Sequence, residues 1–436
     1  MRIKNIKQTI FNEKMRVGQI SFFSGVFFLP SAIAISGILF LISLLISITI
    51  NYKLFLKDKY NKFLLLCSGI IIFSSINSII NLNDITQQNK YFVGIGLINW
   101  IPFFILFATS QIYLKTPEQR KIFSKVIISG TIPVLISCFL QYQLKIYGPF
   151  EILNGLIVWF QKPIAINAGV TGLFNNQNYT GLWLSSILPF SINELKVVYR
   201  EPLKKYILLL INLSIGYYLF LTTSRNAFLG LIFVLLTQLR VKYFLLLSAI
   251  FSFLFFIYNF INKISLNNLI TTNNLLFRKI FFGLFELKNR FIDLERLHIY
   301  KSTIRLINEQ PFFGWGPSTF GNIYKLRNID WNVSYQHAHS LILDIAYNFG
   351  IPFAILIVIF IFKLITDTII RIYKNTSKKE NYLINNSWLV TTLVVIISQI
   401  FDVTYYDGKI GILIWILLAG LKCIIEEEKS ESILSN

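Results

Sequence analysis

Long apolar runs recur along the chain and are separated by short polar segments, many of them basic. About twelve of these runs approach the roughly 20 residues that a helix needs to cross a bilayer. The apolar–polar alternation of an outer-membrane barrel is absent, and helices then remain as the way to satisfy the backbone in lipid. The pattern predicts an all-α fold, a polytopic transmembrane helical bundle. Its spans are expected near residues 19–30, 31–50, 62–80, 92–113, 122–141, 178–193, 203–221, 225–239, 242–261, 341–362, 385–401 and 410–425.

Pro30 lies between the first two of these runs. It either separates two short spans or kinks a single helix.

One polar interval, residues 262–340, is much longer than the others. It divides the chain into about nine N-terminal spans (1–261), the interval itself, and about three C-terminal spans with a tail (341–436). The interval contains all the histidines of the protein: His298, His337 and His339. Because histidine ordinarily titrates near neutral pH, we expect the chemistry of the protein to take place in this interval.

The pattern predicts two helices within the interval, joined through a tight turn. The first covers Asp293–Asn308, where leucine and isoleucine recur at helical spacing. Gly314 and Gly316 then predict a turn in which two backbone segments approach closely. The second helix opens near His337–Ser340 and ends at Gly350, a C-terminal stop signal.

The basic residues are distributed unevenly over the two sides of the bundle. With cytoplasmic N- and C-termini, 26 of the 41 lysines and arginines fall in cytoplasmic segments, as the positive-inside rule requires. The short outer loops hold only Lys90, Lys145, Lys162, Arg225 and Lys409. Ten more lie in the outer interval, against five acids, which leaves it net positive and suited to a phosphate-bearing substrate. The net charge of +20 is therefore mainly a topology signal, and no nucleic-acid partner is expected.

Composition agrees with a membrane protein, since 54% of the residues are hydrophobic and 14% are charged. Cys67, Cys138 and Cys423 fall in separate predicted spans without metal-ligand spacing. Neither a disulfide nor a zinc site is expected.

Three motifs lie on the outer side of this topology. The first combines an arginine, Pro-x-x-Gly-x-Gly and His-x-His, at Arg296, Pro311, Gly314, Gly316, His337 and His339. The second is Ser224-Arg225-Asn226-Ala227, and the third is Gly172-Leu173-Phe174-Asn175-Asn176-Gln177-Asn178. In order, spacing and side, they resemble the O-antigen ligase and polymerase superfamily of bacterial inner-membrane glycosyltransferases. The resemblance extends over most of the chain. That family usually has asparagine after the second histidine; here it is Ser340, which can still cap a helix.

The resemblance implies an activity and its partners. Members move a glycan from an undecaprenyl-pyrophosphate carrier to a periplasmic acceptor hydroxyl, which belongs to lipid A–core in ligases and to a second lipid-linked glycan in polymerases. It also implies a location in the inner (cytoplasmic) membrane and neither a metal ion nor a cofactor. The outer interval likewise contains no Asp-x-Asp pair. We expect the ligase type, with polymerase as the alternative.

Arg225, Arg296 and His339 are the predicted catalytic residues. Departure of a lipid pyrophosphate develops negative charge that fixed guanidinium groups stabilise without a metal. Arg225 also follows hydroxyl residues that can cap a helix, at an N-terminus that favours anions. The alternatives are a snorkelling Arg225 and a solvated Arg296. His339 is expected to polarise the acceptor hydroxyl as a base, or to orient the pyrophosphate as a hydrogen-bond donor.

Five further residues are predicted to bind substrate: His337, Gly314, Gly316, Asn175 and Asn178. The glycines are also turn formers, and the asparagines either bind sugar or cap the following helix. Asp402 and Asp407 flank a short outer loop and are expected to face water, with a sugar contact as the alternative.

A lipid-linked glycan transporter would also have about twelve spans. Transporters place charged or broken-helix sites near the bilayer midplane, whereas here the polar residues gather at one outer face. The pattern therefore favours an enzyme.

Overall fold

The computed structural model describes residues 2–81, 87–165, 168–198, 201–238, 294–327, 335–374 and 379–434. Nearly all of its elements are helices, so the predicted all-α fold is confirmed. The first half contains α1 (Arg2–Phe28), α2 (Ile33–Lys57), α3 (Lys59–Asn81), α4 (Gln87–Gly96), η1 (Leu97–Asn99), α5 (Ile101–Ser110), η2 (Gln111–Tyr113), α6 (Pro117–Tyr142), α7 (Gln177–Val197), α8 (Pro202–Leu221) and α9 (Arg225–Gln238). The second half contains α12 (Leu294–Glu309), α13 (Phe320–Arg327), α14 (Leu341–Phe349), α15 (Ile351–Lys374), α16 (Lys379–Phe401) and α17 (Gly408–Leu434). The predicted span 242–261 lies outside the described residues.

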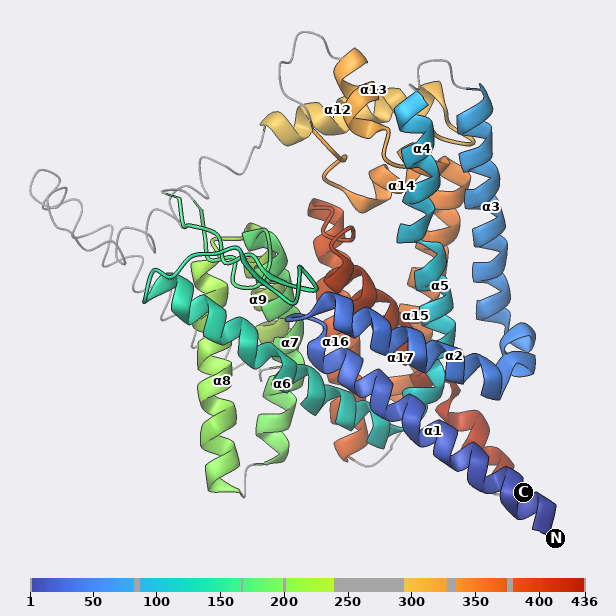
Figure 1. Ribbon diagram of the computed structural model, residues 1–436, viewed down its shortest axis with the longest axis vertical. Coiled ribbons are helices and arrows are strands. Elements are labelled where there is room, and N and C mark those ends of the chain that lie inside the picture. Colours follow the sequence, from blue (N-terminus) through green and yellow to red (C-terminus); the bar gives the residue numbers. More distant parts are fainter. Residues whose placement is uncertain are drawn as a thin grey trace, which may run out of the picture.

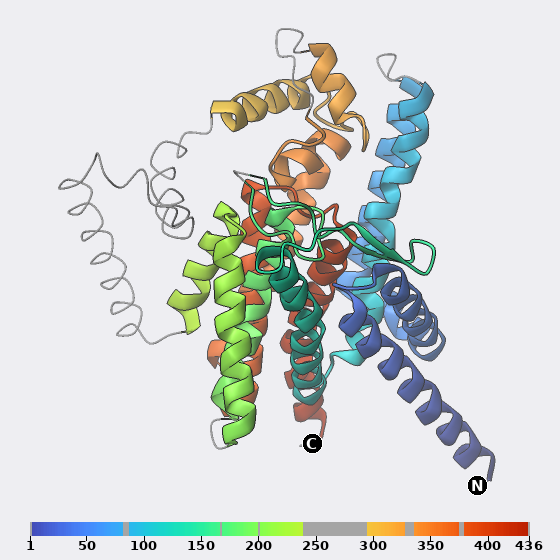
Figure 2. The same ribbon diagram turned by 60° about the vertical axis from the view of Figure 1, so that its left-hand side comes forward.

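The bundle has two distinct ends. Both termini lie at the lower end in Figures 1 and 2, which we call the terminal end, and α12 and α13 lie across the opposite end, which we call the cap end. Between them, α7 packs against α6, α8, α9 and α16 and is buried over most of its length. The cap end is where the motifs of the polar interval come together.

Among the described residues, eight helical segments are long and apolar enough to cross a membrane, and each corresponds to a predicted span. They are Ile33–Ile50, Lys59–Asn81, Lys90–Tyr113, Pro117–Tyr142, Pro202–Leu221, Ile351–Lys374, Glu380–Phe401 and Gly408–Glu427. Three other predicted spans fall on α1, α7 and α9, which do not reach that length and hydropathy. For α7 the reason is its central position, because buried serines, a threonine and an asparagine are tolerated there and not against lipid. The three cysteines are buried and free, as predicted.

Two predicted boundaries are settled by breaks in the backbone. Pro30 lies in a turn that separates α1 from α2. The predicted helix end at Gly350 (φ +89°) is confirmed, and the membrane-crossing segment begins one residue later, so the predicted span 341–362 starts too early. A Cβ at Gly350 would lie 2.1 Å from the carbonyl oxygen of Phe312, so the loop after α12 requires glycine there.

A short antiparallel hairpin interrupts the loop between α6 and α7 and was not predicted. Strands β1 (Phe150–Ile152) and β2 (Ile157–Trp159) pair with Phe150 opposite Trp159. The indole Nε1 of Trp159 donates to the carbonyl of Ser31 at 2.8 Å, so the hairpin rests on the α1–α2 turn.

We predict that Gly350→Ala destabilises the protein by at least about 2 kcal/mol, because the left-handed backbone and the contact with Phe312 both resist a side chain. Thermal unfolding in detergent measures the effect. Gly216→Ala in α8, where a Cβ meets nothing within 4 Å, is the control and should be neutral or slightly stabilising. Equal melting temperatures for the two variants would contradict the account of this break.

Candidate functional site

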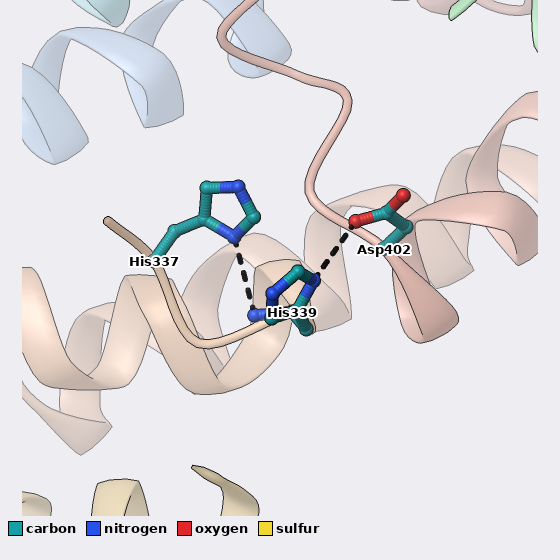
Figure 3. A group of neighbouring side chains, drawn as sticks. All are labelled: His337, His339 and Asp402. Atoms are coloured by element: carbon teal, nitrogen blue, oxygen red, sulfur yellow. Dashed lines mark hydrogen bonds and ion pairs between the residues drawn. The ribbon is translucent and has the colours of Figure 1, made fainter. Parts of the chain in front are cut away.

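A buried carboxylate joins three segments at the cap end. Asp402 follows α16, is 5% exposed, and its Oδ1 lies 3.2 Å from Nδ1 of His339 (Figure 3). Its Oδ2 accepts from the side-chain amide of Asn178 at 2.9 Å, and Oδ1 also accepts from the backbone N–H of Val403 at 3.0 Å. The expectation that Asp402 faces water is therefore wrong: it is enclosed because the loop before α14 and the first turn of α7 both converge on it.

His339 presents one ring nitrogen to Asp402. Its backbone has φ +53°, an uncommon conformation for a residue with a side chain, and Tyr300 donates its hydroxyl to the carbonyl of His339 at 3.2 Å. An ionised Asp402 makes Nδ1 the protonated nitrogen, and Nε2 is then the acceptor. With the side chain 25% exposed, the geometry suits a base that takes a proton from a bound molecule.

Charges at the site set the protonation of its acids and bases. Burial alone would raise the pKa of Asp402, but the hydrogen bond and charge of His339 and the charges of Arg296 and His337 outweigh it, so the pKa is lowered. Burial, together with the charges of His339 and Arg296, lowers the pKa of His337 to about 4, although Asp402 opposes this. At neutral pH Asp402 is therefore ionised and His337 is neutral.

The two histidines contact each other directly. Their ring centroids are 4.6 Å apart, and the backbone N–H of His339 donates to Nδ1 of His337 at 3.4 Å (Figure 3). A neutral His337 can accept this bond, which helps to hold the unusual backbone of His339.

Arg296 lies beside this pair. The predicted helix containing it is confirmed as α12, and the guanidinium donates to the carbonyl of Phe401 at 2.9 Å, one residue before Asp402. The buried face of α12 carries Ile299 and Leu306, whereas Leu297, at one of the expected apolar positions, is 45% exposed. With Ile299 and Leu306 facing the core, the side chain of Arg296 reaches the end of α16.

Arg225 begins α9 at the same end of the bundle. The hydroxyl of Ser224 accepts from the backbone N–H of Ala227 at 3.4 Å, which confirms the predicted cap. A Cβ on Gly181 of α7 would lie only 2.6 Å from that of Ala227, so the two helices touch near their N-termini. The first turn of α7 carries Asn178, which places Arg225 next to the segment that reaches Asp402.

The third motif is held by the loop that contains Asp402. The side chain of Asn176 caps α7 by accepting from the N–H of Asn178 at 2.8 Å. The expectation that Asn175 or Asn178 caps this helix is therefore wrong, and their sugar contact stays a prediction. Lys409, 4% exposed, donates to the carbonyl of Leu173 at 3.1 Å and its Nζ lies 4.5 Å from the ring centroid of Phe174.

The two motif glycines close the C-terminus of α14. Gly314 (φ +66°) and Gly316 (φ +89°) confirm the predicted turn. The N–H of Trp315 donates to Tyr347 at 2.8 Å and that of Gly316 to Asn348 at 3.0 Å, which satisfies carbonyls that a helix end leaves unpaired. A substrate contact by the glycines stays a prediction. The turn alone requires glycine at both positions, because both have positive φ.

Asp344 supports the histidine loop from behind and was not singled out by any motif. It is 2% exposed and accepts from the backbone N–H of Ala338 at 3.3 Å, from the amide of Asn348 at 2.9 Å and from the hydroxyl of Tyr406. Burial raises its pKa to about 6. Ser340 stands at the cap position of α14 but its side chain makes no capping bond, so the predicted serine cap is wrong.

Asp407 has a separate structural task. Its Oδ1 accepts from the N–H groups of Lys409 at 3.0 Å and Ile410 at 3.2 Å, which caps α17. It is only partly exposed, so the expectation that it simply faces water is wrong as well.

His337, His339 and Asp402 also form a donor set for a metal ion. One ligand atom from each lies within 4.8 Å of the others, and two imidazoles with a carboxylate suit divalent transition metals. The hydrogen bond between His339 and Asp402 occupies one donor atom of each residue. That the chemistry needs no metal stays a prediction.

These features define a polytopic helical membrane protein with a histidine–aspartate site at one end. Residues 209–378 match the family model described as O-Antigen ligase, which confirms the resemblance of the chain to the O-antigen ligase superfamily. The match covers Arg225, Arg296, His337 and His339, and ends before Asp402. No curated protein matches the chain.

The lowered pKa of His337 predicts a loss of stability in acid. The unfolded chain protonates this residue near pH 6.5, whereas the folded protein resists protonation down to about pH 4. Its contribution is therefore full above pH 6.5 and is lost as the pH falls toward 4. The melting temperature should fall more for the wild type than for His337→Gln between pH 7 and pH 5. Equal falls in the melting temperatures of the two proteins would refute the lowered pKa of His337.

Proposed function

We propose that this protein transfers a glycan from undecaprenyl pyrophosphate to an acceptor hydroxyl at the cap end, as an O-antigen ligase with a lipid A–core acceptor. The observation that carries the proposal is the His339–Asp402 pair beside Arg296, within or next to the segment that matches the O-antigen ligase family. A polymerase, with a second lipid-linked glycan as acceptor, would use the same residues.

In this mechanism His339 is the base. Its Nε2 takes the proton of the acceptor hydroxyl while the hydroxyl oxygen bonds to the anomeric carbon, and the bond from that carbon to the carrier pyrophosphate breaks. Asp402 fixes the tautomer through Nδ1 and stabilises the imidazolium that forms. His337, neutral at pH 7, adds no competing positive charge.

The leaving pyrophosphate is assigned to Arg225 and Arg296. An apolar groove of about 280 Å³ between α9 and α16 supports this placement: Asn226, next to Arg225, and Phe401, whose carbonyl binds Arg296, both line it. Its other lining residues are mainly apolar: Leu229, Gly230, Ile232, Phe233, Leu236, Val394, Ile397 and Ser398. The hydrocarbon of the carrier in this groove would place its pyrophosphate near both guanidinium groups, which stabilise the departing charge without a metal.

The same proposal sets the orientation of the protein in the membrane. The cap end faces the periplasm and the terminal end faces the cytoplasm of a bacterial inner membrane. The excess of basic residues in the segments assigned to the cytoplasm supports this arrangement. Polar groups gathered at one end, outside the candidate spans, favour an enzyme over a transporter.

We predict that Asp402→Asn lowers the rate of glycan transfer by about 10- to 100-fold, since the amide no longer fixes the His339 tautomer. His339→Ala should reduce the rate further. The double variant should be no slower than His339→Ala, because the two residues act as one unit. Transfer by purified protein is the measurement, with labelled carrier-linked glycan and acceptor.

Asp407→Asn is the matched control, because it makes the same chemical change in the same loop while asparagine still caps α17. It should retain near-normal transfer. Independent, multiplicative losses in the double variant, or an equal loss in Asp407→Asn, would rule out the His339–Asp402 unit.

Deletion of the gene in its bacterial host, followed by a gel of cell-surface lipopolysaccharide, separates the two acceptors. A ligase predicts lipid A–core without any glycan and accumulation of carrier-linked polymer. A single remaining repeat unit would indicate the polymerase instead. Unchanged lipopolysaccharide would contradict both. Product formation by purified protein in detergent excludes simple transport, since detergent solution has no compartments.

A further inference from the structure

A large cavity lies at the terminal end, away from the histidine site. It has a volume of about 660 Å³ and opens between α1, α2, α5, α6 and α17. Ligand sites in proteins commonly have this volume and combine apolar walls with a few fixed polar groups. The proposed glycan transfer uses none of its residues.

One lining residue of the cavity, Lys422, is a buried and paired cation. Lys422, 4% exposed at its side chain, lies 2.9 Å from Asp58 and 3.2 Å from Glu426, and it donates to the amide oxygen of Gln111 at 2.6 Å. Another acid of the lining, Glu427, is paired with the fully buried Arg120. The acids of the lining are therefore largely neutralised from within the protein.

The rim carries positive charge that the described residues do not neutralise. Lys57 and Lys115 line the cavity, both are exposed, and neither forms an ion pair within the described part of the chain. The lining holds three lysines and three acids, and the acids are paired with Lys422 and with Arg120 behind the lining, which leaves the charges of the two rim lysines available. An anion at the rim would meet two lysines without displacing an internal salt bridge.

The position of the rim relative to the spans indicates where that anion would come from. Lys57 follows the candidate span Ile33–Ile50, and Lys115 lies between the spans that end at Tyr113 and begin at Pro117. Both lysines are thus at the expected level of lipid headgroups. Phe11, Met15 and Phe55 contribute apolar wall to the same cavity.

We propose that this cavity binds an anionic phospholipid of the leaflet at the terminal end. Lys57 and Lys115 contact its phosphodiester, and its acyl chains lie against the apolar wall. Basic pockets between membrane helices bind lipid headgroups in this manner. Because Lys422 joins the α2–α3 turn to α17, a lipid seated above it would hold together helices that are far apart in the sequence.

The test is native mass spectrometry and thermal unfolding of the purified full-length protein with phosphatidylglycerol, phosphatidylcholine or water-soluble glycerol 3-phosphate. The wild type should retain a phosphatidylglycerol molecule and melt at a higher temperature in its presence. Phosphatidylcholine should bind at least about fivefold more weakly, because its headgroup has no net charge. Glycerol 3-phosphate should bind weakly, because it lacks the acyl chains.

Lys57→Gln combined with Lys115→Gln should weaken phosphatidylglycerol binding about fivefold or more, since two phosphate contacts are lost. Both lysines are exposed, so the variant should fold. The control is Lys205→Gln with Lys374→Gln, the same charge change near the ends of α8 and α15, outside the cavity; it should bind like the wild type.

Three results would overturn the proposal. Equal binding of phosphatidylcholine would remove the role of the rim lysines, and equal binding of glycerol 3-phosphate would remove that of the apolar wall. An equal loss in the control variant would mean that binding follows net charge and not this cavity. None of these outcomes depends on glycan transfer, so the function proposed above is tested separately.

Discussion

The arrangement of the cap end depends on keeping one ionised carboxylate buried. An unpaired charge inside a protein is costly, and Asp402 is tolerated because His339, Asn178 and the backbone of Val403 bind it while Arg296 lies close by. These groups come from the loop before α14, from α7, from the loop after α16 and from α12. Removing Asp402 would therefore affect the orientation of His339 and also the contact between α7 and the histidine loop.

Other bonds behind this carboxylate make the histidine loop rigid. Asp344 holds the backbone at Ala338, between the two histidines, and connects it to Tyr406 in the loop that contains Asp402. The turn at Gly314 and Gly316 closes the other end of α14. His339 keeps an uncommon left-handed backbone within this frame. Such conformations persist only where the surrounding structure determines them, and they are frequent at functional sites.

The two ends of the bundle use charge differently. At the terminal end, Arg120 and Lys422 are paired with acids and fasten α17 to α6 and to the α2–α3 turn. At the cap end, the ionised Asp402 is bound by His339 and lies close to Arg296, while His337 is neutral. α17 connects the ends, since Asp407 caps its start beside the site and its other end lines the large cavity. Arg296 and His339 are partly exposed and can reach a phosphate-bearing substrate, whereas the fully paired charges of the terminal end suit a structural role.

The sequence by itself determined the helical class, eight of the spans, α12 and the glycine turn, because these depend on local periodicity or on short motifs. Its motifs also singled out Arg296 and His339, whose catalytic roles stay predictions. It predicted the helix end at Gly350 as a stop signal, but not the close approach of Phe312, which comes from another segment. Nor did it identify Asp402, Asp344 or Lys409 as buried. A lone charged residue at the end of an apolar run looks solvated in sequence; its burial depends on partners more than 60 residues away, such as Asn178 for Asp402, which only the tertiary structure brings within hydrogen-bonding distance.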